Sequence, residues 1–427
     1  MRKKSLSSLQ AVHSHALPVA IDFGASALRL LQIAAGEPPR LVAAAQIEVP
    51  DELLADPAAR LRFQIDSLPK LVKKSKFTTK RAVFMIPSGQ IFCKHMQFQL
   101  SEGVDVESLL RATLPTQVGC DYESLVCRHV TVNEGNRGGK SEVICMAASR
   151  ELVGRLMQAI KVSHLEPVGV HSPFQAAIRA FWGINRRAED LSRTTLYVDL
   201  GYGGTNVLIA EGENLVFART VELSGLHMDQ AIAQQARVNL HDARALRRRI
   251  MMEQPSTAPK TAATGGEGLA MLTAALSAAK HDSSDATEAQ SQTDAVAVAE
   301  ERRMGQKNAP GLGSEVAPAP SRTVFPPGVN LKEQLEILTD EIQMCVRYHK
   351  SMFPNRPIER AIFFGGDARQ PWLCQHLARG LRMAVQVSDP IGSLTRSGSE
   401  TTIGVNFGEP QPGWTAALGM CLSPTDL

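Results

Sequence analysis

Two stretches of this 427-residue chain follow one pattern, in which an apolar strand ends at an aspartate and a glycine-containing turn leads into a second apolar strand. The first is "VAIDFGASALRLLQI" at 19–33, and the second is "LYVDLGYGGTNVLIA" at 196–210. The residues that the pattern singles out are Asp22, Gly24 and Ser26 in the first stretch and Asp199, Gly201, Gly203, Gly204 and Thr205 in the second.

These residue types suit the binding of phosphate and of a divalent cation. Backbone N–H groups in a tight turn converge on an anion, glycines let the anion come close, and a Ser or Thr hydroxyl adds a donor. An aspartate at the strand end can hold Mg²⁺ through water, because Mg²⁺ gives up its hydration shell reluctantly. Two such turns, one from each half of the chain, would hold a triphosphate from both sides. The pair therefore predicts that Asp22 and Asp199 face one magnesium nucleotide between two lobes.

Two other nucleotide-binding motifs are excluded by their context. The glycines at 201–204 look like a dinucleotide fingerprint, but that motif needs a helix directly after the glycines. Here "TNVLIAEGENLVFART" follows, which reads as strand, turn and strand. No GxxxxGK[ST] sequence occurs either, so a P-loop is excluded.

The elements around the two turns repeat in the same order. A third strand follows each turn, at 40–49 and 214–223, and then a helix, near 57–74 and 226–238. Each half later has a buried strand that begins Arg-Ala, at 81–87 and 360–366. This internal repeat predicts two structurally similar halves. The second buried strand runs into Gly365 and Gly366 before a helix, and these glycines would let an adenosine lie against the backbone.

Three other segments differ from the repeated halves in their sequence pattern or composition. Residues 88–165 read as strand, helix, strand, strand and helix, which predicts a small subdomain. Residues 254–329 are rich in Ala, Ser, Thr, Gly and Pro and poor in large apolar residues, so we expect a disordered insertion there. Residues 331–353 repeat apolar side chains at helical spacing and predict one long amphipathic helix on the second half.

The composition excludes several classes of protein. A net charge of +3 is too small to indicate nucleic-acid binding. The seven cysteines form no CxxC pair, so neither a zinc site nor a disulfide framework is expected, and reduced thiols suggest the cytoplasm. No apolar run approaches the roughly 18 residues of a membrane span. The basic N-terminus has no apolar stretch of the kind a signal peptide needs. We expect no direct membrane insertion.

The order of these motifs resembles the actin, Hsp70 and FtsA superfamily, and within it the PilM family of type IV pilus assembly proteins. The resemblance covers nearly all of 18–421 apart from the insertion, and it is carried by the two turn motifs, "ICMAASRELVGRLMQAIKVSHLEPVGVHSPFQAA", "FFGGDAR" and "GWTAALGM". It implies an α/β, actin-like ATPase fold with two ribonuclease-H-like lobes and a small subdomain of the FtsA and PilM type, called 1C. The implied domains are 18–87, 166–194 and 391–427 for lobe 1, 88–165 for the 1C-like subdomain, 195–253 and 330–390 for lobe 2, and 254–329 for the insertion.

The resemblance also implies roles for individual residues. Asp22 and Asp199 match the aspartates that face Mg²⁺, and Arg29 matches the basic residue of the first phosphate motif. The other implied nucleotide contacts are Gly24, Ser26, Gly201, Gly203, Gly204, Thr205, Arg247, Gly365, Gly366 and Arg369. Gln175 stands where actin has a glutamine that positions the attacking water, although the local match is short.

Some positions depart from the family pattern. Arg29 replaces a lysine, which keeps the charge and changes its shape. In "NLHDARALRRR" (239–249) the usual Ala-Glu becomes Ala243-Arg244, and Arg247 takes the lysine position. Tyr202 places a bulky ring in the second turn. These changes argue against fast turnover.

The function implied by the resemblance is a cytoplasmic scaffold of the pilus assembly platform, peripheral to the inner membrane through a partner. Such a scaffold would bind ATP and Mg and capture the cytoplasmic N-terminal tail of a PilN-like membrane protein. Contacts with pilus motor ATPases, self-association and slow ATP hydrolysis remain open. Two alternatives also remain: a small-molecule phosphotransferase of the same superfamily, and an actin-like protein related to FtsA or to type II secretion.

Overall fold

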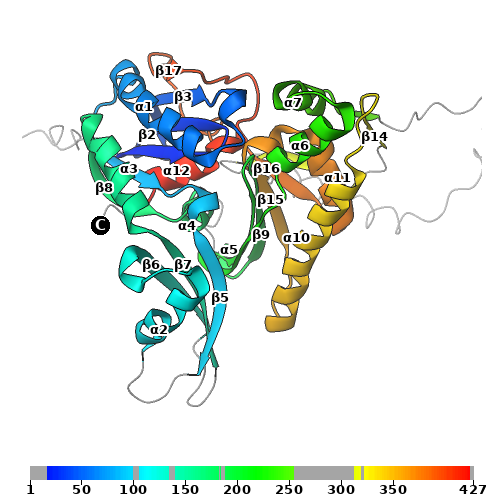
Figure 1. The fold of residues 1–427 in the computed structure, drawn as a ribbon, viewed down its shortest axis with the longest axis horizontal. Coiled ribbons are helices and arrows are strands. Elements are labelled where there is room, and N and C mark those ends of the chain that lie inside the picture. The colour runs from blue at the N-terminus through cyan, green and yellow to red at the C-terminus, as the bar shows by residue number, and fades with distance from the viewer. Residues whose placement is uncertain are drawn as a thin grey trace, which may run out of the picture.

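The fold consists of two lobes and a small subdomain (Figure 1). It was obtained as a computed structural model, which describes residues 17–99, 105–133, 140–181, 183, 188–253, 312–318 and 322–423. Each lobe is built on a mixed β-sheet with helices on both of its faces.

The sheet of the first lobe has the strand order β17-β3-β2-β1-β4-β8. Strand β2 runs antiparallel to β1 and β3, whereas β4 is parallel to both β1 and β8. The strands are β1 (Val19–Phe23), β2 (Ala27–Ala34), β3 (Arg40–Glu48), β4 (Arg81–Met85), β8 (Glu166–His171) and β17 (Thr401–Ile403).

The sheet of the second lobe repeats this arrangement, with the order β11-β10-β9-β15-β16-β13. Strand β10 is antiparallel to β9 and β11, and β15 is parallel to β9 and β16. The strands are β9 (Thr194–Leu200), β10 (Thr205–Glu211), β11 (Asn214–Val221), β13 (Leu312–Val316), β15 (Arg360–Phe364) and β16 (Val385–Ser388). The five strands β11-β10-β9-β15-β16 match β3-β2-β1-β4-β8 and confirm the internal repeat predicted from the sequence, whereas the sixth strands, β13 and β17, lie at opposite edges of their sheets.

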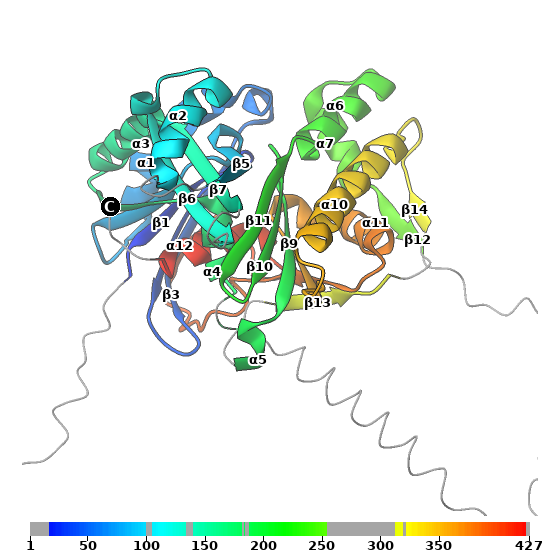
Figure 2. The same cartoon turned by 90° about the horizontal axis from the view of Figure 1, so that it is seen from below.

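Helices cover the outer faces of the sheets, and two short helices lie between the sheets. In the first lobe the outer layer is α1 (Pro57–Ser75) and α3 (Arg150–Val162). In the second it is α6 (Gly225–Ala236), α7 (Leu240–Arg248), α10 (Lys332–Met352) and α11 (Pro371–Leu381). Between the two sheets lie α4 (Pro173–Arg179) and α12 (Thr415–Cys421), as Figure 2 shows. Their side chains form one core with the inner faces of both sheets, so the lobes share a hydrophobic hinge.

The small subdomain is a three-stranded antiparallel sheet, β5-β7-β6, with one helix packed on it. Its elements are β5 (Phe92–Gln99), α2 (Val106–Val118), β6 (Leu125–Asn133) and β7 (Lys140–Ser149). The range predicted for the subdomain, 88–165, also included α3. Val153, Leu156 and Ile160 of α3 pack instead in the core of the first lobe, so the packing assigns this helix to that lobe.

The insertion predicted to be mostly disordered at 254–329 has paired strands in its last part. Residues 312–316 form β13, which pairs with β16 at the edge of the second sheet. Strand β14 (Arg322–Val324) pairs with β12 (Met251–Glu253). The helix α5 (Ala188–Leu191) precedes β9. Residues 254–311 lie outside the described part of the chain.

A glycine at the hinge gives a direct test of this packing. A Cβ at Gly419 of α12 would lie 1.6 Å from the carbonyl oxygen of Ala176 in α4. Gly419→Ala must therefore separate the two helices, and we expect it to lower the free energy of unfolding by about 1–3 kcal/mol or more. The matched control is Gly154→Ala in α3, where nothing lies within 4 Å of the new Cβ. That variant should be unchanged or gain up to about 1 kcal/mol. Equal denaturation midpoints for the two variants would contradict the described hinge.

Candidate functional site

The two glycine turns meet at the entrance between the lobes. A Cβ at Gly203 would lie only 2.7 Å from the Cβ of Ala25, so the turns after β1 and β9 are in direct contact. Asp22 and Asp199 both line the cavity beside these turns, which encloses about 220 Å³. Among the predicted site residues, the described lining of this cavity includes Asp22, Gly24, Ser26, Arg29, Asp199, Gly201, Gly203, Gly204, Gly365 and Gly366. The structure thus brings together ten of the residues predicted from the sequence.

Asp22 lies at the end of β1, where the strand register places it opposite Arg29 of β2. The Arg29 Nη1 lies 3.4 Å from Asp22 Oδ2, and Arg29 Nε donates to Gln46 at 3.0 Å. Asp22 Oδ1 is buried and has no hydrogen-bond partner among the described residues. Burial raises the pKa of Asp22 to about 6, although the charge of Arg29 acts to lower it.

Asp199 lies at the matching position of β9, opposite Asn206 of β10. Asn206 Nδ2 donates to Asp199 Oδ2 at 2.9 Å, and Asn206 Oδ1 accepts from Thr220 at 2.9 Å. Burial raises the pKa of Asp199 to about 6, the hydrogen bond from Asn206 lowers it, and the charge of Asp22 raises it. The two carboxylates therefore disfavour each other's ionisation.

Asn206 was not among the site residues predicted from the sequence, although the internal repeat indicates it. Asn206 follows Asp199 by seven residues, as Arg29 follows Asp22, and each pair lies directly opposite in its hairpin. The two halves therefore hold their aspartates with different partners. Arg29 brings a positive charge to the first carboxylate, whereas Asn206 orients the second with a neutral amide.

Glycines form the third wall of the cavity. Gly365 has a φ of 88°, and a Cβ there would lie 2.3 Å from Asp199 Oδ1. The Gly365 N–H donates to the carbonyl of Pro412 at 3.1 Å. A Cβ at Gly413 would lie 3.2 Å from Arg29 Nη2. A side chain is therefore excluded at Gly365 and would crowd Arg29 at Gly413, and the backbone of Gly365 borders the space beside Asp199.

A second cavity of about 540 Å³ adjoins the first, and Ser26, Arg29, Tyr202 and Gly366 line both. Its lining includes Arg247 and Arg369, which were predicted to contact nucleotide. Both are already paired: Arg247 Nε donates to Asp229 at 2.5 Å, and Arg369 donates to Glu409 at 2.7 Å.

Asp367 is also close to Arg247, at 3.0 Å from Nη1. Burial lowers the pKa of Arg247, but the charges of Asp367 and Asp229 outweigh it and raise that pKa. Arg247 is therefore a fixed cation inside the second lobe.

Two predicted residues lie away from the cavities. The Thr205 hydroxyl donates to the carbonyl of Leu223 at 2.8 Å, and Thr205 is not among the described residues that line either cavity. Gln175 lines a separate cavity with Arg179 and Arg356, beneath the β10–β11 hairpin. Gln175 is not among the described residues that line the cavity beside Asp22 and Asp199.

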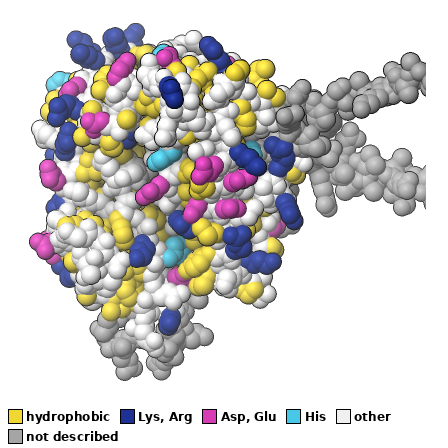
Figure 3. Space-filling view, turned by 45° about the vertical axis from the view of Figure 1, so that its right-hand side comes forward, with side chains coloured by type: hydrophobic (Ala, Val, Ile, Leu, Met, Phe, Trp, Pro, Cys, Tyr) yellow, Lys and Arg dark blue, Asp and Glu magenta, His cyan; other side chains and the backbone are white. Residues whose placement is uncertain are grey.

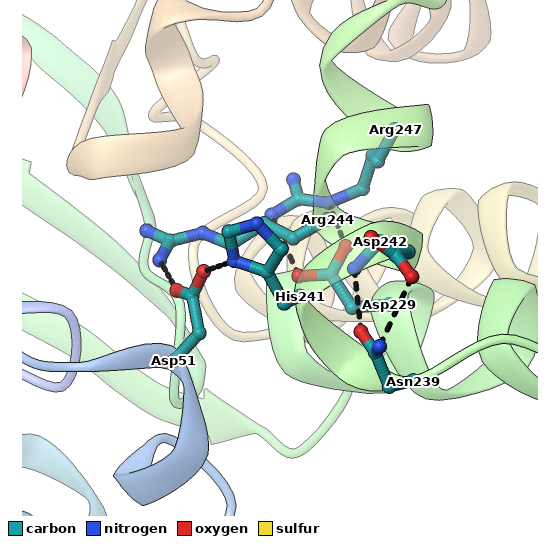
Figure 4. A network of polar contacts seen from close by, with 7 residues as sticks. All are labelled: Asp51, Asp229, Asn239, His241, Asp242, Arg244 and Arg247. Atoms are coloured by element: carbon teal, nitrogen blue, oxygen red, sulfur yellow. Dashed lines mark hydrogen bonds and ion pairs between the residues drawn. The ribbon is translucent and has the colours of Figure 1, made fainter.

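A polar and aromatic contact closes the lobes over the second cavity. The Tyr202 ring packs with Val49 and Leu54 of the first lobe and lies 5.0 Å below the guanidinium of Arg244. Arg244 and His241 of α7 both pair with Asp51 of the first lobe, as Figure 4 shows. We call Asp51, Tyr202, His241 and Arg244 the cleft latch. Within it, Arg244 is the residue for which the sequence resemblance implies a glutamate.

The small subdomain contacts the second lobe through another set of side chains. His95 of β5 stacks on Phe217 of β11 with ring centres 4.9 Å apart, and its Nε2 accepts the N–H of Ala218. Its Nδ1 lies 3.4 Å from Glu142, which also accepts from the Tyr348 hydroxyl of α10 at 2.8 Å. We call His95, Glu142, Phe217 and Tyr348 the subdomain contact.

The comparisons with known proteins agree with this geometry. The family model described as "Type IV pilus assembly protein PilM" matches residues 20–256, which is more than half of the chain. The chain belongs to the PilM family. The comparison with curated protein sequences finds no match.

Solved structures show the fold of this PilM-family chain. The "PilM-PilN type IV pilus biogenesis complex" aligns with a TM-score of 0.61 at 18% identity, over 95% of this chain and 97% of that chain. The fold is therefore the actin-like α/β fold of the family. MreB5 of Spiroplasma citri bound to ADP aligns at a TM-score of 0.44 and 9% identity, over 96% of both chains. EutJ from Carboxydothermus hydrogenoformans aligns at 0.42 and 14%, over 95% of this chain and 89% of that one.

The described part of this PilM-family chain has neither a membrane-spanning helix nor a cluster of metal ligands. None of the described helices is both long and apolar enough to cross a membrane. The described part of the chain also holds no group of three or more His, Cys, Asp or Glu side chains that could enclose a metal ion.

The raised pKa values make stability depend on pH. Between the ordinary value of 3.8 and the folded values of about 6, the folded chain holds protons on Asp22 and Asp199 that the unfolded chain has lost. The free energy of unfolding should therefore fall as pH rises through this range. Asp199→Asn removes one of these ionisations and keeps an oxygen for Asn206, so at about pH 8 its melting temperature should exceed wild type by about 2–4 °C.

The control for this experiment is Asp66→Asn, on the exposed face of α1. It should follow the wild-type profile of melting temperature against pH. A profile for Asp199→Asn that is as steep as wild type, with no gain at high pH, would show that Asp199 ionises freely.

Proposed function

We propose that this PilM-family chain binds ATP and Mg²⁺ between its lobes and serves as a scaffold of the type IV pilus assembly platform. In this proposal it captures the cytoplasmic N-terminal tail of a PilN-like inner-membrane protein. The observation that carries the nucleotide site is the direct contact of the two glycine turns, with Asp22 and Asp199 beside them.

The donor set suits Mg²⁺ held through water and phosphate oxygens. Asp22 Oδ1 is a buried carboxylate oxygen with no hydrogen-bond partner among the described residues. The charge of Asp22 also raises the pKa of Asp199. Two carboxylates without a third protein ligand suit Mg²⁺, which usually keeps several waters and binds one or two carboxylates together with substrate phosphates. The ion would supply charge neutralisation for the phosphates.

Different parts of the chain would contact the phosphates and the adenosine of the nucleotide. The backbone of 24–26 and 201–204 would contact the phosphates, with Arg29 as the nearby cation. Gly365 and Gly366 would support the adenosine, which fits the adjoining cavity of about 540 Å³. Because the turns touch and the cleft latch bridges the lobes, nucleotide entry requires the lobes to move apart at this latch.

Slow hydrolysis fits the same geometry. The proposed water-positioning glutamine lies in another cavity. Two glutamines line the first cavity among the described residues: Gln64, which already donates to the carbonyl of Gly24 at 2.7 Å, and Gln90. A general base must reach the attacking water within hydrogen-bond distance. We therefore propose a nucleotide-dependent scaffold with little or no turnover.

The partner tail would lie in a groove between the first lobe and the small subdomain. The subdomain follows β4 of the first lobe in the chain and also contacts the second lobe through His95 and Tyr348. In this proposal, closure of the lobes around a nucleotide would move the subdomain, because the subdomain is joined to the first lobe by the chain and to the second lobe by these contacts. Two sites linked through one such rearrangement change each other's affinity by the same factor. In this proposal the protein acts in the cytoplasm, and its partner holds it at the inner membrane.

Calorimetric titration with Mg–ATP tests the nucleotide site. Asp22→Asn keeps the side-chain shape and removes the charge, so we expect at least about a tenfold loss of affinity, or 1.4 kcal/mol. Asp66→Asn, a charge removed from the exposed face of α1, should bind as wild type does. Unchanged affinity in a folded Asp22→Asn protein would refute the assigned site.

The same titrations extend to the partner. A synthetic peptide of the N-terminal tail of the PilN-like protein should bind wild type with a dissociation constant that changes severalfold when Mg–ATP is added. In Asp22→Asn the peptide should still bind, but addition of Mg–ATP should leave its affinity unchanged. No peptide binding in either state would argue against capture of the tail.

A further inference from the structure

A group of exposed lysines lies at one end of the first lobe. Residues 67–81, "SLPKLVKKSKFTTKR", contain six basic residues and no acidic one. They begin in the second half of α1 and continue through the connection to β4. The exposed basic side chains are those of Lys70, Lys73, Lys74, Lys76, Lys80 and Arg81.

The end of α3 joins the same surface. The N–H of Glu166 donates to the carbonyl of Lys80 at 2.6 Å, and Glu166 pairs with Arg81 in the sheet. The turn from Lys161 to Leu165 therefore lies beside Lys80. Lys161 is exposed, and its neighbour Val162 is 58% exposed. We call Lys70, Lys73, Lys74, Lys76, Lys80 and Lys161 the lysine face. Figure 3 shows Lys and Arg side chains gathered along the upper left, on the side of the first lobe.

Helix stability explains only part of this charge. Lys73, Lys74 and Lys161 lie in the last turns of their helices, where cations offset the helix dipole. Lys76 is the C-cap residue of α1 and can act in the same way, whereas Lys70 lies further inside the helix and Lys80 lies beyond its end. Within the described residues, none of the six lysines forms an ion pair. The buried arginines of the cleft, Arg29, Arg244 and Arg247, each form an ion pair with an aspartate. The lysines of this surface differ from them in having no such partner among the described residues.

We propose that the lysine face lies against an anionic phospholipid surface. Lysines are point charges on flexible stems, which suit a diffuse layer of headgroups, whereas ordered phosphate recognition favours the planar fork of arginine. Nucleic-acid sites also combine arginine with stacked aromatic rings, and 67–81 contains one aromatic residue, the partly buried Phe77. Exposed Val162 adds apolar contact at the edge of the face. The inference rests on the proposed function in one respect: the membrane partner's tail brings this face within reach of the bilayer.

Vesicle sedimentation of the full chain, without nucleotide or peptide, tests the proposal. Vesicles of phosphatidylethanolamine with about 30% phosphatidylglycerol should bind the protein at low salt and release it at about 0.5 M salt. Phosphatidylcholine vesicles should not bind it. The triple variant Lys73→Gln/Lys74→Gln/Lys80→Gln should lose about a hundredfold in partitioning, at about fivefold for each lysine.

The matched control removes the same charge elsewhere, as Lys140→Gln/Lys332→Gln/Lys350→Gln, and should retain wild-type binding. Equal losses in the two triples would show an effect of net charge and overturn the proposal. So would the absence of vesicle binding, or its complete loss on neutralising Arg2, Lys3 and Lys4 instead. Because ATP and peptide are absent, failure here leaves the nucleotide and tail-binding proposals standing on their own tests.

Discussion

The structure depends on one electrostatic constraint: two buried carboxylates from different lobes lie beside the same cavity. Each aspartate lies near the end of a central strand, Asp22 in β1 and Asp199 in β9. Each contacts the residue opposite it in its hairpin, which is Arg29 for Asp22 and Asn206 for Asp199. Their burial disfavours the charged forms, and their proximity adds repulsion. A cation between them would relieve both costs. In the proposed function, this cation would also contact the buried carboxylate oxygen of Asp22 that has no partner among the described residues.

Every larger feature maintains this arrangement. The repeated strand order brings the two turns together, and the shared core around α4 and α12 sets the axis about which the lobes can move. The cleft latch joins the two lobes, and the subdomain contact joins the small subdomain to the second lobe through β5, β7, β11 and α10. The small subdomain is therefore in contact with the same lobe that carries Asp199.

The sequence predicted the parts of this site that depend on neighbouring residues. Asp22, Asp199 and their glycines belong to strand-and-turn signals a few residues long, and the repeat related them to each other. Asp51 could not be connected with Arg244 in this way, since 193 residues separate them and only the closed lobes bring them together. Thr205 was predicted as a phosphate donor, but a nearby carbonyl takes its hydroxyl. The composition of 312–316 did not predict a strand, because this short segment has few apolar residues. Its strand, β13, is held by pairing with β16. The helix α3 follows the subdomain in sequence, whereas its apolar face packs on the first lobe.

The most direct test of the central claim is a crystal structure of the protein with Mn²⁺ and a non-hydrolysable ATP analogue, with the metal located by anomalous scattering. The account predicts one manganese peak between the carboxylates of Asp22 and Asp199, with the phosphates against the backbone of 24–26 and 201–204. A nucleotide bound elsewhere, or a metal that contacts only one lobe, would contradict it.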